Sequence, residues 1–126
     1  MQEYETCKKI EGELDSMGIP HKRIGETGVY GWIDGKKAGD GVTVALRADI
    51  DALAMEDLKE VPYHSQNAGV CHACGHDAHT ATLLTVAKIL KAKENEFSGQ
   101  VRLFFQQAEE IGQGARQFVQ AGLLDG

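Results

Sequence analysis

The chain alternates between segments with helical periodicity and short apolar runs. Residues 3–17 place Ile10, Leu14 and Met17 on one stripe, which predicts a helix that ends before Gly18. Residues 78–93 carry a second stripe at helical spacing, and Asp77 is placed to cap that helix. Residues 113–121 form a third predicted helix.

Four apolar runs lie between these helices. Residues 21–24 and 29–33 predict two short strands around a glycine-bounded turn. Residues 42–48 are almost continuously apolar, as expected for a strand covered on both faces, and residues 101–105 predict a second buried strand. The order strand, helix, strand from residue 42 to residue 105 predicts a βαβ unit with parallel strands. The fold class is therefore α/β, in one small domain.

One long segment, residues 49–75, lacks regular periodicity. Loops of this length within compact domains are usually functional or disordered. We therefore expect the segment to contribute to a site.

Composition and charge exclude several functions. The 126 residues are 42% hydrophobic and 25% charged, with a net charge of −6 and no basic run. This balance argues against nucleic acid or an anionic membrane as partner. No stretch is long and apolar enough to span a bilayer, and residues 1–5 do not resemble a signal peptide, so we expect a cytoplasmic setting.

Polar residues collect where strands end. Asp49 and Asp51 follow one predicted strand, Glu109 and Glu110 follow the other, and residues 71–79 open the helix between them. Sites in open α/β sheets form outside the carboxyl ends of the strands, so all three clusters should lie at one edge. The middle cluster supplies two cysteines and three histidines: Cys71, His72, Cys74, His76 and His79.

These residue types suit a divalent transition metal. Thiolate and imidazole bind Zn, and imidazole with carboxylate also suits Mn, Co or Ni. Cys74 and His76 can face one ion across Gly75, which has no side chain to obstruct them. One glutamate of the adjacent pair can bind the metal, and the other can take a proton from metal-bound water.

Simpler explanations exist for each feature alone. A Glu-Glu pair is more often a solvated loop, and Asp49 and Asp51 are as well explained as loop caps. His79, in the first turn of a helix, is more often structural than a ligand. It is the density of ligand residues between Cys71 and His79 that favours metal binding.

Three blocks of sequence resemble the aminoacylase-like metallo-amidohydrolases, which include N-acyl-amino-acid amidohydrolases, hippurate hydrolases and auxin-conjugate hydrolases. The blocks are residues 46–53 (LRADIDAL), 72–80 (HACGHDAHT) and 105–110 (FQQAEE). Their order and separation also match, and the likeness covers nearly the whole chain.

The resemblance implies a zinc-peptidase-like catalytic domain, with a mixed sheet between helices and a two-metal site. Cys74, His76 and Glu110 would be metal ligands, and Glu109 would be the general base that activates water. Asp49 would orient a ligand. The implied reaction is hydrolysis of the amide bond of an N-acyl amino acid.

The chain departs from the family in length and at two positions. Residues 1–126 would form a single partial catalytic domain, without the lid or dimerisation domain and the second catalytic half. No histidine follows His79, so we expect weak metal binding and little activity from this chain alone. Cys71 replaces an apolar residue, and Gln107 replaces a proline, which is expected to loosen the turn that presents Glu109.

Two other functions are compatible with the sequence. The Cys71-x-x-Cys74 pair before a helix is typical of redox or metal-binding modules. A non-catalytic remnant would instead serve folding or assembly, and an open sheet edge would favour self-association.

Overall fold

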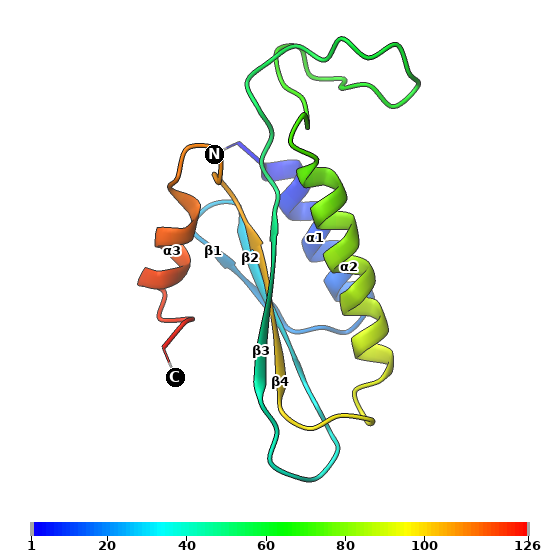
Figure 1. The fold of residues 1–126 in the computed structure, drawn as a ribbon, viewed down its shortest axis with the longest axis vertical. Helices are drawn as coiled ribbons and strands as arrows, with labels where there is room; N and C mark the ends of the chain where they lie inside the picture. The colour runs from blue at the N-terminus through cyan, green and yellow to red at the C-terminus, as the bar shows by residue number, and fades with distance from the viewer. Residues whose placement is uncertain (1, 126) are drawn as a thin grey trace.

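The computed structural model describes residues 2–125 as a four-stranded sheet between helices (Figure 1). The strand order is β1-β2-β4-β3. In chain order the elements are α1 (Tyr4–Ser16), β1 (His21–Ile24), β2 (Gly28–Asp34), β3 (Thr43–Asp49), α2 (His76–Ala92), β4 (Gln100–Gln106) and α3 (Gly114–Gln120). Every predicted helix and strand is present, with ends shifted by at most two residues.

The sheet is mixed, as expected. β1 pairs with β2 and β2 with β4 in antiparallel fashion, whereas β3 and β4 are parallel, from Thr43 opposite Gln100 to Asp49 opposite Gln106. The predicted strand-helix-strand unit is therefore confirmed. Its parallel pairing brings the carboxyl ends of β3 and β4 side by side.

Alternation along β4 divides the apolar residues between two cores. Leu103 and Phe105, both fully buried, pack with α1 and α2 on one face of the sheet. Phe104 points to the other face, where it packs with Tyr30 and with Phe118 of α3. Because successive side chains of a strand point to opposite faces, one strand can serve both cores.

Two sequence predictions are wrong. The strand at residues 42–48 is not covered on both faces: β3 is the edge strand, and Val44 is 44% exposed. Asp77 does not cap α2, because the helix begins one residue earlier and Gly75 occupies the N-cap position. The Asp77 carboxylate accepts the neighbouring Ala78 N–H instead.

The long loop after β3 rises above the end of the sheet (Figure 1). Its two arms are joined by an isolated antiparallel bridge between Leu53 and Cys71, with N–H···O distances of 2.9 and 3.1 Å. The bridge returns the chain to the carboxyl end of β3 just before α2 begins. Within residues 2–125, no helix has the length and apolarity needed to cross a bilayer.

Glu94 links the C-terminal end of α2 to the segment after β2 through ion pairs. Its carboxylate pairs with Lys36, from the segment after β2, and with Lys91 at 2.7 Å. These hydrogen bonds, first that of Lys36, lower the pKa of Glu94 below its ordinary value of 4.5.

Candidate metal centre

The three predicted clusters meet at one end of the sheet. Glu110 follows β4, His76 opens α2, and Asp51 lies two residues beyond β3. Asp51 accepts hydrogen bonds from both of the other residues. The topological argument from the sequence therefore placed these segments correctly.

Cys74, His76 and Glu110 offer one ligand atom each, all within 4.8 Å of one another. His76 Nε2 lies 3.8 Å from Glu110 Oε1. A hydrogen bond to Glu110 is the main cause that raises the pKa of the Cys74 thiol. Thiol, imidazole and carboxylate within such a radius are a donor set that fits a divalent transition metal.

The orientation of His76 is fixed by Asp51. His76 Nδ1 lies 3.1 Å from both the backbone carbonyl oxygen and Oδ1 of Asp51. A carbonyl oxygen can only accept, so Nδ1 carries the proton and Nε2 keeps its lone pair. The ring is buried, at 5% exposed, which preserves this arrangement. His76 thus presents Nε2, with its lone pair available, as a candidate metal ligand.

Asp51 also holds the neighbouring ligand. Its second oxygen, Oδ2, accepts the backbone N–H of Glu110 at 3.0 Å. One buried carboxylate, 4% exposed, therefore joins two candidate ligands from different elements. This role was missed in the sequence, although Asp49 and Asp51 alternate and so share one side of the extended chain.

Gly75 is required for its backbone rather than for its size. Its φ is +77°, in the left-handed region, and no atom lies within 4 Å of the position that a Cβ would take. The expectation that a side chain there would obstruct an ion is therefore replaced by a conformational reason. The left-handed residue turns the chain so that Cys74 and His76 approach one point.

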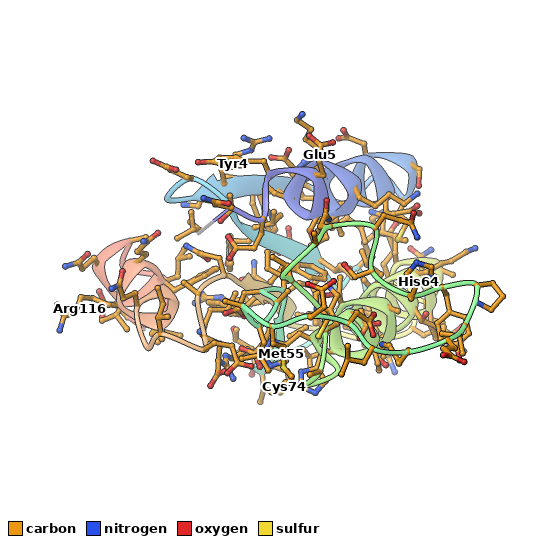
Figure 2. The ribbon with its side chains drawn as sticks, turned by 90° about the horizontal axis from the view of Figure 1, so that it is seen from above. Tyr4, Glu5, Met55, His64, Cys74 and Arg116 are labelled. Atoms are coloured by element: carbon orange, nitrogen blue, oxygen red, sulfur yellow. The ribbon has the colours of Figure 1, made fainter. Side chains whose placement is uncertain are left out.

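Figure 2 shows Cys74 at the periphery, while the loop carries His64 away from it.

Glu109 is presented by a strained turn. The preceding residue, Ala108, has φ of +52°, a conformation that costs an L-residue about 1 kcal/mol. Its carbonyl accepts the N–H groups of Gln113 at 3.1 Å and Gly114 at 3.3 Å, which hold the turn. Glu109 Oε2 lies 4.0 Å from His76 Nε2, with its side chain 42% exposed. The carboxylate thus faces both the candidate ligands and solvent.

Gln107 does not loosen this turn. The side chain is 1% exposed, and its amide donates to the Ile24 carbonyl at 3.2 Å and to Gln117 Oε1 at 2.7 Å. These bonds anchor the segment before Ala108 to β1 and α3. The amide thus restrains the turn by hydrogen bonding where a proline would restrain it through its ring.

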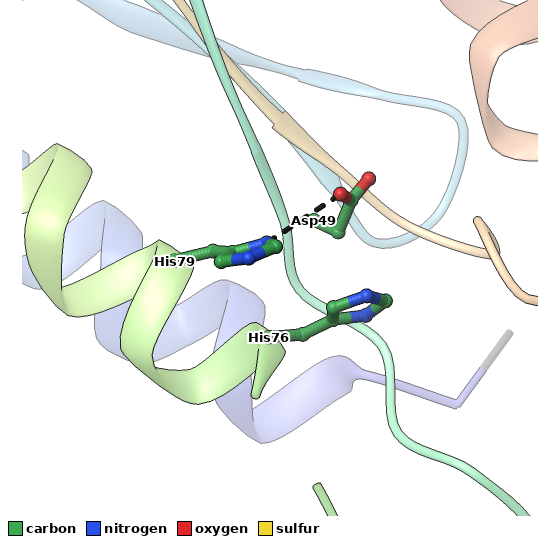
Figure 3. Close-up of side chains that lie close together, drawn as sticks. All are labelled: Asp49, His76 and His79. Carbon is green, nitrogen blue, oxygen red and sulfur yellow. Dashed lines mark ion pairs between the residues drawn. The ribbon is translucent and has the colours of Figure 1, made fainter. Parts of the chain in front are cut away.

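Asp49 lies close to His76 and His79 (Figure 3). Its Oδ2 is 3.6 Å from His79 Nδ1, and its Oδ1 is paired with Arg47. The rings of His76 and His79 stack with centroids 5.2 Å apart. The hydrogen bonds that orient His76 come from Asp51, so the orienting role expected of Asp49 stays a prediction.

The two cysteines of the Cys-x-x-Cys pair have different surroundings. Cys71 is buried and bridges to Leu53 through its backbone, whereas Cys74 is exposed beside Glu110. Both are free thiols. Cys74 belongs to the candidate ligand set with His76 and Glu110, and Cys71 does not.

Comparison with known proteins gives a consistent picture. The chain is 48% identical over 125 residues to IAA-amino acid hydrolase ILR1-like 4 of Arabidopsis thaliana, covering 98% of this chain and 28% of that protein. It is 44% identical over 126 residues to N-acetyl-L-cysteine deacetylase of Bacillus subtilis (strain 168), covering 99% of this chain and 30% of that protein. The chain thus spans about a third of the length of these relatives.

A solved structure has the same fold. The Bacillus subtilis YXEP protein, described as a dinuclear metal binding peptidase from the M20 family, superposes with a TM-score of 0.93 at 43% identity. The match covers 100% of this chain and 35% of that one. A sequence profile of Peptidase family M20/M25/M40 matches residues 45–126, which include every candidate ligand. The chain belongs to Peptidase family M20/M25/M40.

Proposed function

We propose that Cys74, His76 and Glu110 bind a divalent metal ion and that Glu109 is the general base in hydrolysis of an N-acyl amino acid. The observation that carries this proposal is that the Asp51 carboxylate accepts hydrogen bonds from both the His76 ring and the Glu110 backbone N–H. It leaves His76 Nε2 without a proton and directed to the same point as the Glu110 carboxylate. Such preorganisation is typical of ligand sets rather than of incidental acidic loops.

The donor set favours Zn and is also compatible with Mn, Co or Ni. A bound divalent ion would polarise an amide carbonyl and lower the pKa of a coordinated water to about 7. Glu109 would accept the proton of that water, because its carboxylate lies beside His76 Nε2 and reaches solvent. Asp49 would act through His79, by holding the His79 ring against that of His76.

The substrate class is supported by the relatives. An IAA-amino acid hydrolase and an N-acetyl-L-cysteine deacetylase both act on an amide bond of a small acylated amino acid. The net charge of −6 favours such a small molecule over nucleic acid. The relatives are about three times longer, so further ligands are expected outside these residues, and the 126-residue chain should hydrolyse little substrate alone.

Metal titration of the purified chain tests the ligand set. The metal-free protein, its Glu110→Gln variant and its Glu109→Gln variant would be titrated with Zn²⁺ against a chromophoric chelator. We expect Glu110→Gln to weaken binding at least about tenfold and Glu109→Gln to bind nearly as the parent does. Equal affinity in all three proteins would contradict the assignment of Glu110.

Hydrolysis is measured separately, with N-acetyl-cysteine and an indole-3-acetyl amino acid as substrates. Any turnover found at high protein concentration should disappear in the Glu109→Gln variant while the bound metal remains. Rates typical of a complete enzyme, median about 10 s⁻¹, would overturn the expectation that the isolated chain is nearly inactive.

A further inference from the structure

A second ligand set adjoins the first. Asp49, His76 and His79 also place one ligand atom each within 4.8 Å of one another (Figure 3). The set comes from the end of β3 and the first turn of α2, where residues three apart lie on one face of the helix. Asp49 and His76 are buried, and His79 is exposed. The open side of this set is therefore the side of His79.

The two sets share His76 and cannot both use it. Its Nδ1 is engaged by the Asp51 carbonyl and carboxylate, which leaves Nε2 as its one available lone pair. One nitrogen lone pair binds one ion. The sets are therefore alternatives for a single ion at that nitrogen.

We propose that Asp49, His76 and His79 form a second, thiol-free site for a divalent cation, which competes with Cys74 and Glu110 for His76. This inference rests on the proposed metal binding at His76. The chemical difference between the sites is the thiolate: one offers sulfur, nitrogen and carboxylate, the other two nitrogens and a carboxylate. Thiolate favours Zn, whereas imidazole with carboxylate is also suitable for Mn, Co and Ni.

The neighbouring charges determine which of the two sites has the higher affinity for a cation. Arg47 pairs with Oδ1 of Asp49 and lowers the affinity of that carboxylate for a cation, although Oδ2 still faces His79. The Cys74 set contains the Glu110 carboxylate, and the carboxylates of Asp51 and Glu109 lie beside its His76. The Cys74 set should therefore hold the ion first. Loss of the exposed Cys74 thiol should leave the ion bound to His76 together with Asp49 and His79 instead of releasing it.

Cobalt(II) distinguishes the two positions by absorption. A thiolate ligand adds a charge-transfer band in the near ultraviolet, and a nitrogen and oxygen site shows ligand-field bands alone. The 126-residue chain, its Cys74→Ser variant and the double variants Cys74→Ser/His79→Gln and Cys74→Ser/His64→Gln would be titrated with Co²⁺. His64 is the matched control, because it is an exposed histidine carried by the long loop. Circular dichroism would establish that each variant is folded.

We expect the parent to show the charge-transfer band, and Cys74→Ser to bind one Co²⁺ without it. His79→Gln should then raise the dissociation constant of Cys74→Ser at least about tenfold, whereas His64→Gln should leave it unchanged. Absence of Co²⁺ binding by folded Cys74→Ser overturns the second site, as does equal binding with and without His79. Absence of the band in the parent overturns the proposed Cys74 ligand instead, so the two failures are distinguishable.

Discussion

Replacement of Asp51 by alanine tests how the site is preorganised. The substitution removes two charge-assisted hydrogen bonds, to His76 Nδ1 at 3.1 Å and to the Glu110 N–H at 3.0 Å. Hydrogen bonds to charged groups contribute about 1.5–3 kcal/mol each. The contact of Nδ1 with the Asp51 backbone carbonyl remains in the variant. Loss of the carboxylate bond to the imidazole therefore corresponds to a decrease in metal affinity of at most roughly 10- to 100-fold, since each 1.4 kcal/mol is tenfold. Supporting residues of metal ligands have effects of about this size.

The free energy of unfolding of the metal-free protein should fall by less than the summed energies of the two hydrogen bonds. Asp51 is 4% exposed, so its removal also relieves the cost of burying a charged carboxylate. Urea denaturation of metal-free protein should therefore show a loss smaller than the sum, on the order of 1–2 kcal/mol. The two measurements separate an effect on ligand geometry from an effect on folding.

The affinity assay is a competition for Zn²⁺ against a chromophoric chelator. Asp51→Asn should lie between the parent and Asp51→Ala, because its amide can accept one of the two N–H groups but must turn its NH₂ toward the other. Asp49→Asn should have the smaller effect on this site, because Asp49 faces His79 and Arg47. If folded Asp51→Ala binds Zn²⁺ within twofold of the parent, the carboxylate does not organise the ligands and the reasoning fails.

Three other substitutions test the framework of the site. Gly114→Ala should destabilise the protein by about 1–3 kcal/mol or more in urea denaturation, because its Cβ would lie 1.6 Å from the Gln107 carbonyl oxygen; unchanged stability would contradict this contact. Leu103→Ala should cost about 2–5 kcal/mol by the same measurement, since the side chain is fully buried. Glu94→Gln should flatten the acid dependence of unfolding: the folded pKa is depressed, so the stabilisation is complete above the ordinary value of 4.5 and is lost as pH falls through the folded pKa. Parallel pH profiles for this variant and the parent would refute that role for the two lysine pairs.

The sequence predicted the elements and their convergence because both depend on local patterns. Hydrophobic periodicity located α1 and α2, and the strand-helix-strand order led to parallel pairing of β3 and β4. Once that pairing is known, the residues after each strand must be neighbours. The candidate ligands were placed together by this argument before any distance was known.

The failures concern information that is absent from local patterns. The apolar run of β3 does not reveal that the strand lies at the sheet edge, because its position is set by pairing with β4 alone. Asp77 has the residue type of an N-cap, but the left-handed Gly75 starts the helix at His76. The distinction between Asp49 and Asp51 depends on which carboxylate the loop turns toward His76. Each of these outcomes is decided by tertiary contacts.

The position of Asp51 explains how a long irregular loop can coexist with an ordered site. The carboxylate lies before the bridge between Leu53 and Cys71, and the candidate ligands Cys74 and His76 lie after it. The bridge joins the two arms of the loop, so residues 54–70 form an excursion outside the hydrogen bonds that orient the ligands. The geometry of the centre therefore depends on the ends of β3, β4 and α2 and on one bridge. We therefore expect changes in residues 54–70 to leave the hydrogen bonds that orient the candidate ligands in place.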